Sequence, residues 1–199
     1  MNTGVSQEHK FIGHLERLVR DQDRGALAAL RRGLGKPPGT AREMDRHVLR
    51  FVPAGTKKSQ ENAYYLVGAL FADWHQGKDT VGPNPPENMG ASLRALVDRE
   101  AADGGNRDEA EKRTEKRLVA LLNCHQDELP DHLRHTIGLL KSKEIPVNWV
   151  QLLRDIQNWY RESRDVQRQW ARKFWRNFQG EKETTNVPDK ETIEENKEE

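Results

Sequence analysis

The sequence predicts an all-α protein in which a small N-terminal helical domain is followed by a C-terminal helical bundle. Apolar residues recur at three- and four-residue spacing along most of the chain, and the alternation typical of strands is nearly absent. A Gly- and Pro-rich stretch, QGKDTVGPNPPENMG, separates two groups of such segments. We therefore expect an N-terminal domain at 1–78, a linker at 79–90 and a bundle at 91–179.

The N-terminal domain is predicted to contain four helices. The first covers about 9–19, and Asp23 can cap the second, which ends in the sequence GLGKPPG. A third helix is expected after a cap at Thr40 and stops before Pro53. The segment 61–75, ENAYYLVGALFADWH, is apolar on most of its faces, which is typical of a central buried helix.

The C-terminal half is predicted to contain four more helices. They begin near residue 91, cover 111–123 and 129–141, and end with 147–178, which we interpret as one long helix, straight or bent. Helices joined by short loops are typical of a bundle.

Composition favours a cytoplasmic protein. Hydrophobic residues make up 34% of the 199 residues and charged residues 33%, and no apolar run approaches the length of a membrane span. The N-terminus does not have the charged-then-apolar layout of a signal peptide. A single cysteine excludes an intramolecular disulfide framework. We expect no membrane partner.

Charge is distributed unevenly along the chain. Residues 180–199 contain eight acidic residues and three lysines, a net charge of −5, so residues 1–179 carry +6 because the whole chain carries +1. The acidic tail has too few apolar groups to offset the entropy of ordering it, and we expect it to be disordered.

The predicted last helix has two different faces on a helical wheel. The apolar face carries Ile156, Trp159, Tyr160, Val166, Trp170 and Phe174. The opposite face carries Arg161, Arg164, Arg168, Arg172 and Arg176. Like charges at this spacing repel each other, so such a face favours an anionic partner. Arginine suits phosphate because its planar guanidinium donates paired hydrogen bonds and stays protonated.

Shorter basic stripes occur earlier in the chain. Arg42, Arg46 and Arg50 follow one another at four-residue spacing on the predicted third helix. Other basic residues surround the second helix and occupy the loop after the third: Arg24, Arg31, Arg32, Lys36, Lys57 and Lys58. A solvated helix face is the ordinary alternative for any one stripe, but several together favour phosphate binding.

A zinc site and a nuclease site are weaker interpretations. The histidine and cysteine residues that invite a zinc site are Cys124, His125, His132 and His135, but structural zinc usually takes four ligands with paired cysteines. The carboxylates Glu109, Glu111 and Glu115 alternate with basic residues, as on an ordinary ion-paired helix. No P-loop, GxSxG or strand-linked GxGxxG motif occurs. We expect no catalysis, no metal and no cofactor.

Two further alternatives concern binding. The arginine faces could dock acidic surfaces of partner proteins, because arginine is also enriched in protein interfaces. Trp74, Trp149 and Trp159 are expected in the core, whereas Trp175 lies nearer the arginine face and is the aromatic residue best placed to stack on a base.

Six segments occur in a recognisable order: DRGALAALRRGLG, YYLVGALFADWH, NMGASLRAL, EKRLVALLNC, LRHTIGLLKSKEIPVNWVQLLRDIQNWY and QRQWARKFW. From about Phe11 to Phe178, the chain resembles the CasB family, the small subunits of the type I-E CRISPR surveillance complex, Cascade. The resemblance implies an all-α protein present in two copies beside the large and backbone subunits of an antiviral complex. It also implies binding without catalysis, with basic surfaces against the guide RNA, the target DNA or the displaced strand.

Together, the stripes and the resemblance predict one set of nucleic-acid-binding residues: Arg24, Arg31, Arg32, Arg46, Lys57, Lys58, Lys116, Arg117, Arg134, Arg161, Arg164, Arg168 and Arg172. Our hypothesis is that these residues stabilise the R-loop, the guide–target hybrid with its displaced strand, through backbone phosphates. Phosphate contacts carry no direct base readout, so no sequence preference is expected.

Overall fold

The computed structural model describes residues 5–78, 84–125 and 127–176. Within these ranges it contains helices and no strand, which confirms the all-α fold class. The elements are α1 (Gln7–Arg20), α2 (Arg24–Arg31), η1 (Arg42–Met44), α3 (Asp45–Val48), η2 (Leu49–Phe51), α4 (Lys58–Trp74), α5 (Met89–Ala102), α6 (Arg107–Asn123), α7 (Leu129–Ser142), α8 (Trp149–Asn158) and α9 (Asp165–Trp175). The acidic tail and residues 79–83 of the predicted linker lie outside the described residues. No described helix combines the length and apolar character needed to cross a bilayer.

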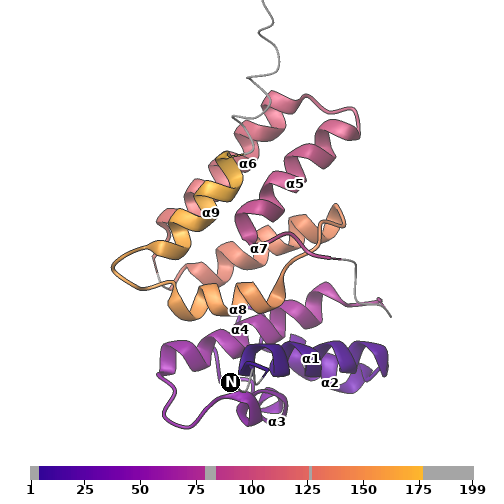
Figure 1. The fold of residues 1–199 in the computed structure, drawn as a ribbon. Coiled ribbons are helices and arrows are strands. Elements are labelled where there is room, and N and C mark those ends of the chain that lie inside the picture. Colours follow the sequence, from indigo (N-terminus) through magenta and orange to yellow (C-terminus); the bar gives the residue numbers. More distant parts are fainter. Residues whose placement is uncertain (1–4, 79–83, 126, 177–199) are drawn as a thin grey trace, which may run out of the picture.

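Helix α4 is the central element of the N-terminal half. It lies between α1, α2 and α3 on one side and α8 on the other (Figure 1). Ten of its 17 residues are buried, which confirms the predicted central helix. Gly68 faces the side chains of Leu30 and Phe11, whose nearest atoms lie 3.4 Å from the position that a Cβ would occupy.

Helix α8 joins the C-terminal half to α4 through aromatic contacts. The Trp149 ring meets Phe71 edge-on at a centroid distance of 5.4 Å and Trp74 at 6.0 Å. Such edge-to-face pairs are favourable beyond the area they bury. Trp74, Trp149 and Trp159 are all buried, as predicted.

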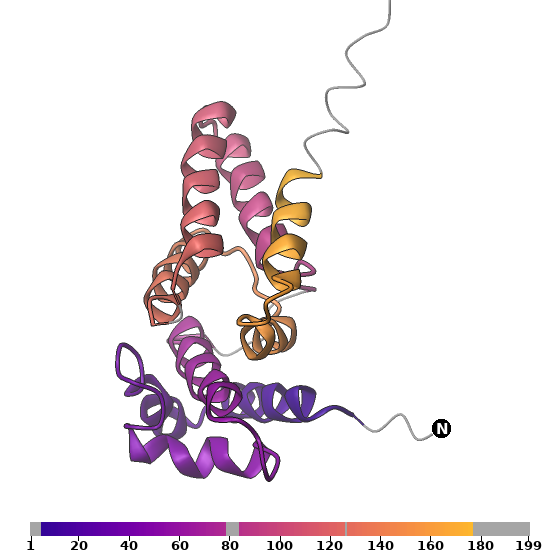
Figure 2. The same cartoon turned by 90° about the vertical axis from the view of Figure 1, so that its left-hand side faces the viewer.

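Helix α5 packs against both α6 and α9 in the other part of the molecule (Figure 2). The crossing of α5 and α9 is tight because Gly90 has no side chain: a Cβ there would stand 1.9 Å from the Trp170 carbonyl oxygen. Trp170 itself is fully buried, and its indole Nε1 donates to Asp155 Oδ2 at 2.6 Å.

Of the two predicted helix N-caps, Asp23 and Thr40, the structure confirms only the first. Asp23 caps α2 as predicted, with its carboxylate accepting from the Ala26 amide at 2.9 Å. The predicted cap at Thr40 is wrong, but a helical segment does follow and ends before Pro53 as predicted. The Thr40 hydroxyl instead donates to the Pro37 carbonyl at 2.7 Å, and the segment that follows is divided among η1, α3 and η2. The Arg42, Arg46 and Arg50 stripe therefore lies on a run of short 3-10 and α-helical turns and not on one regular α-helix.

The predicted single helix over 147–178 is also wrong. The chain leaves α8 at Trp159 and enters α9 only after Arg164, which has a left-handed φ of 50°. Two contacts hold the turn: the Gln167 side chain donates to the Trp159 carbonyl at 2.8 Å, and the Trp159 and Trp170 rings lie 4.7 Å apart. The chain thus turns sharply between the two helices, and residues of both line a hollow beside the turn.

Candidate nucleic-acid interface

The turn between α8 and α9 creates a polar hollow of about 430 Å³. Four arginines and several amide and carboxylate groups line it: Gln151, Arg154, Asp155, Asn158, Arg161, Asp165, Val166, Arg168, Gln169 and Arg172. Three of these arginines, Arg161, Arg168 and Arg172, belong to the predicted set. The break in the helix therefore gathers them around one concavity.

The pattern of α9 explains how its arginines reach the hollow. Val166, Trp170 and Phe174 are buried on the face toward α5 and α8. Arg168 and Arg172, one turn apart on the same helix, are exposed. The predicted separation of apolar and arginine faces therefore holds within α9, although it does not extend through the turn into α8.

Arg161, Arg168 and Arg172, which we call the arginine triad, have no ion pair within the described part of the chain. The two carboxylates in the hollow have other partners. Asp165 accepts from the Ser163 hydroxyl at 2.6 Å. Asp155 accepts from Trp170 and from Gln151, and burial raises its pKa. The hollow therefore has excess positive charge that an anion can neutralise.

Arg164 is placed apart from the triad. Its guanidinium donates to the Leu122 carbonyl at the end of α6, so it ties the turn to the neighbouring helix. It does not line the hollow. The structure thus gives this predicted site residue an intramolecular partner.

Several predicted residues of the N-terminal half and α7 pair with carboxylates. Arg32 lies 3.5 Å from Glu43, Lys58 lies 2.7 Å from Glu61, and Arg134 lies 3.7 Å from Asp131. The structure brings Lys58 and Arg134 to the same loop, 33–39. A Cβ on Gly39 would stand 3.6 Å from Lys58 Nζ, and one on Gly35 would stand 3.1 Å from an Arg134 guanidinium nitrogen.

The other predicted residues are scattered. Arg31 is half-buried and donates to the Ala72 carbonyl at 3.4 Å, and Arg46 Nε donates to His47 Nε2 at 2.9 Å. Arg24, Lys57 and Lys116 are exposed, and Arg117 is half-buried. None of these six residues lines the hollow between α8 and α9.

Trp175, predicted as a stacking residue, is half-buried and packs against the core. Its indole Nε1 donates to Glu115 Oε1 of α6 at 3.2 Å. This bond holds the ring against α6.

The histidine and cysteine residues considered for zinc do not form a site in the described ranges, where no group of three or more His, Cys, Asp or Glu side chains could hold a metal. Burial also raises the pKa of the Cys124 thiol, which disfavours the thiolate that binds metals.

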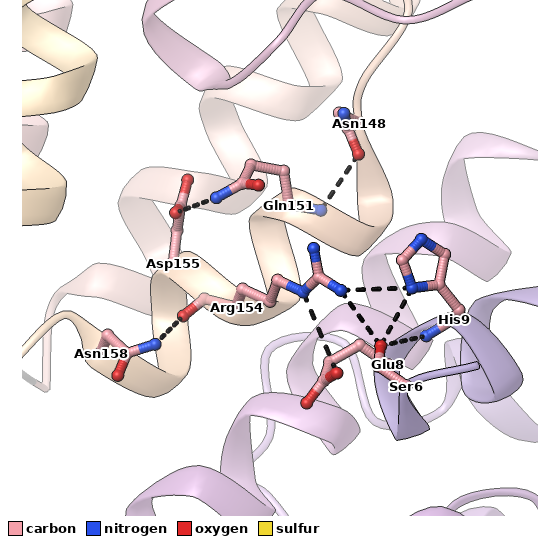
Figure 3. A network of polar contacts seen from close by, with 8 residues as sticks. All are labelled: Ser6, Glu8, His9, Asn148, Gln151, Arg154, Asp155 and Asn158. Atoms are coloured by element: carbon pink, nitrogen blue, oxygen red, sulfur yellow. Dashed lines mark hydrogen bonds and ion pairs between the residues drawn. The ribbon is translucent and has the colours of Figure 1, made fainter. Parts of the chain in front are cut away.

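Arg154 is the residue of the hollow that the sequence analysis missed. It precedes Arg161 and Arg168 by seven and fourteen positions, a spacing that places all three on nearly the same side of a helical wheel. From that spacing, Arg154 could have been predicted as a further member of the arginine face. Arg154 also reaches the N-terminal end of α1 (Figure 3).

The fold and the hollow place this chain among all-helical proteins that have a hollow lined by arginines on their surface. Comparison with known proteins identifies the family: residues 26–175 match the model of the CRISPR-associated protein Cse2 family, and the chain belongs to it. A CRISPR-associated protein Cse2 from Thermus thermophilus is 30% identical over 173 residues, which cover 86% of this chain and 91% of the relative. The predicted CasB-family membership is thereby confirmed.

Solved structures agree with this assignment. CasB from M. ruber is 26% identical, with a TM-score of 0.69 over 92% of this chain and 99% of that chain. A chain of a CRISPR RNA-guided surveillance complex is 27% identical, with a TM-score of 0.71 over 90% of this chain and 98% of that chain.

Proposed function

We propose that this protein is a non-catalytic, nucleic-acid-binding subunit of an RNA-guided antiviral complex. In this role it stabilises the R-loop by contacting backbone phosphates. The observation that carries the proposal is the arginine triad, three exposed guanidiniums around one hollow without a carboxylate partner in the described residues. Family membership and the likeness to a chain of an RNA-guided surveillance complex support the setting.

The mechanism depends on a small energetic bias. Exchanging a DNA duplex for a guide–target hybrid is nearly balanced, so modest contacts to a backbone can decide whether the open state persists. Guanidiniums that neutralise phosphates release condensed counterions and favour the bound strand without reading its bases. The triad supplies three such contacts on a single-stranded segment, for which the displaced strand is the natural candidate.

The partners follow from the same setting. Guide RNA and target DNA, the large and backbone subunits and a second copy of this chain are the expected neighbours in the complex. Lys58, near Gly39, and Arg134, near Gly35, offer a second basic surface for these contacts beside loop 33–39. Because both residues are paired with carboxylates, we expect this surface to contribute less than the triad.

The proposal is tested by titrating the full chain into labelled single-stranded DNA at several salt concentrations and recording fluorescence anisotropy. The variant replaces the triad, Arg161, Arg168 and Arg172, with glutamine. A matched control replaces Arg20, Arg99 and Arg113, each of which pairs with a carboxylate, and so removes the same charge elsewhere.

We expect the wild type and the control to bind with similar steep salt dependence. In the triad variant, the slope of log K against log salt should become shallower by about 2, since each phosphate contact contributes roughly 0.7 on single strands. An equal loss of affinity and salt slope in both variants would mean that only net charge matters, and would contradict the triad as the binding site. Weak binding of the wild type at every salt concentration would instead favour the alternative function, a scaffold that docks acidic protein surfaces.

A further inference from the structure

Arg154 belongs to two sites at once. It lines the α8–α9 hollow, yet its guanidinium is turned toward the N-terminal end of α1 (Figure 3). There it donates to Ser6 Oγ at 3.1 Å and lies 3.2 Å from His9 Nδ1. Its Nε is 3.9 Å from Glu8 Oε2. A fourth guanidinium beside the arginine triad is thus held by another helix.

The contacts that hold Arg154 are replaceable. The ion pair with Glu8 is long, and the arginine side chain remains 39% exposed, so solvent screens the pair strongly. Ser6 already serves as the N-cap of α1, and its hydroxyl accepts from the His9 amide at 3.5 Å. A phosphate oxygen offers a guanidinium a stronger, charge-assisted and bidentate partner than a serine hydroxyl does.

The backbone on which Arg154 stands is firmly fixed, so only the side chain needs to move. The Arg154 carbonyl accepts from the Asn158 side chain at 2.7 Å. The next residue, Asp155, is buried between Gln151 and Trp170. Because the backbone is fixed and Arg154 already lines the hollow, its flexible side chain is the part that can turn from α1 toward the hollow.

We propose that Arg154 is a fourth phosphate-binding residue, which a bound strand recruits from Glu8 and Ser6. This inference rests on the proposed function and adds to it a competition between α1 and nucleic acid for one guanidinium. Recruitment removes an interaction from the first turn of α1. Strand binding therefore loosens that turn, and Glu8 weakens strand binding.

The test uses the same titration of the full chain with labelled single-stranded DNA. Arg154→Gln should weaken binding about threefold at low salt and flatten the salt slope by roughly 0.7. Glu8→Gln should tighten binding about twofold, as expected from loss of a competing, partly exposed ion pair. In the Arg154→Gln background, Glu8→Gln should have no further effect, because no guanidinium is left at position 154 for Glu8 to hold.

Glu16→Gln is the matched control for Glu8→Gln. Glu16 lies on the same helix, and its carboxylate is also 3.9 Å from an arginine, Arg20, which is outside the hollow. We expect less gain from this variant than from Glu8→Gln. Hydrogen exchange supplies an independent measurement: amides of the first turn of α1 should exchange faster in the wild type when DNA is bound, but not in Arg154→Gln.

Two results would overturn the inference while leaving the proposed function intact: wild-type affinity in Arg154→Gln, or equal gains from Glu8→Gln and Glu16→Gln. Failure of the wild type to bind DNA at low salt would overturn both the proposed function and this inference.

Discussion

At the scale of single residues, the arginines of this protein differ chiefly in their partners. Arg99 and Arg113 lie 3.4 and 2.9 Å from the carboxylates of Asp103 and Glu100, so each has an ion-pair partner within the fold. The arginine triad lacks such partners among the described residues. Because paired and unpaired arginines are both exposed, exposure alone does not distinguish a binding residue from a structural one.

His75 gives the fold a pH dependence that is separate from binding. Burial, together with the nearby cations Lys78 and Lys141, lowers its pKa to about 4, although the Phe71 carbonyl opposes the shift. The unfolded chain takes up a proton at His75 below about pH 6.5, whereas the folded chain resists it. The stabilising contribution is therefore present above pH 6.5 and is lost as the pH falls toward 4.

We predict that this loss disappears in His75→Phe. Between pH 6.5 and 4, the free energy of unfolding of the wild type should fall by up to about 3 kcal/mol more than that of the variant. Urea denaturation at a series of pH values measures the difference. Parallel pH profiles for the two proteins would mean that His75 does not carry the effect.

At the scale of elements, the crossing of α5 and α9 is set by one glycine. Gly90→Ala places a Cβ against the Trp170 backbone, where no flexible side chain can give way, and should cost at least about 1–3 kcal/mol of unfolding free energy. Gly138 of α7 is the control: apart from its chain neighbours and its own helix backbone, no atom lies within 4 Å of its Cβ position, so Gly138→Ala should stabilise by about 0.5–1 kcal/mol. Chemical denaturation of both variants tests the pair, and a neutral Gly90→Ala would contradict the tight crossing.

The sequence predicted those elements whose signals are local. The buried faces of α4 and α9 follow from their own apolar spacing, and Asp23 caps α2 through a contact three residues away. The break between α8 and α9 was not predictable in this way, because no Gly or Pro marks it. It depends on contacts between the two helices, such as the Gln167 bond to Trp159.

In the candidate site, too, only the features with local sequence signals were predicted. The helical period placed Arg168 and Arg172 on one face, and the structure keeps them together. Arg164 was assigned to that face as well, but its left-handed backbone turns it to the Leu122 carbonyl. Arg154 shares a side of the helical wheel with Arg161 and Arg168 but was left out of the predicted set, and the hollow that it lines forms only at the turn between α8 and α9.

At the scale of the whole molecule, the basic residues of the candidate sites form two separate surface regions, each built from more than one element. The triad lies at the α8–α9 turn, whereas Lys58 of α4 and Arg134 of α7 lie beside Gly39 and Gly35 of loop 33–39. The described part of the chain lies within the body whose net charge is +6, which favours approach to a nucleic acid at low ionic strength.

The most direct measurement is the lifetime of the R-loop formed by the reconstituted complex, compared among the wild type, the triad variant and the matched control at Arg20, Arg99 and Arg113. Three lost phosphate contacts should shorten the lifetime by roughly tenfold or more, at about 0.5–1 kcal/mol for each contact, and leave the control unchanged. A triad variant that assembles normally and keeps the wild-type lifetime would contradict phosphate binding by the triad as the basis of function.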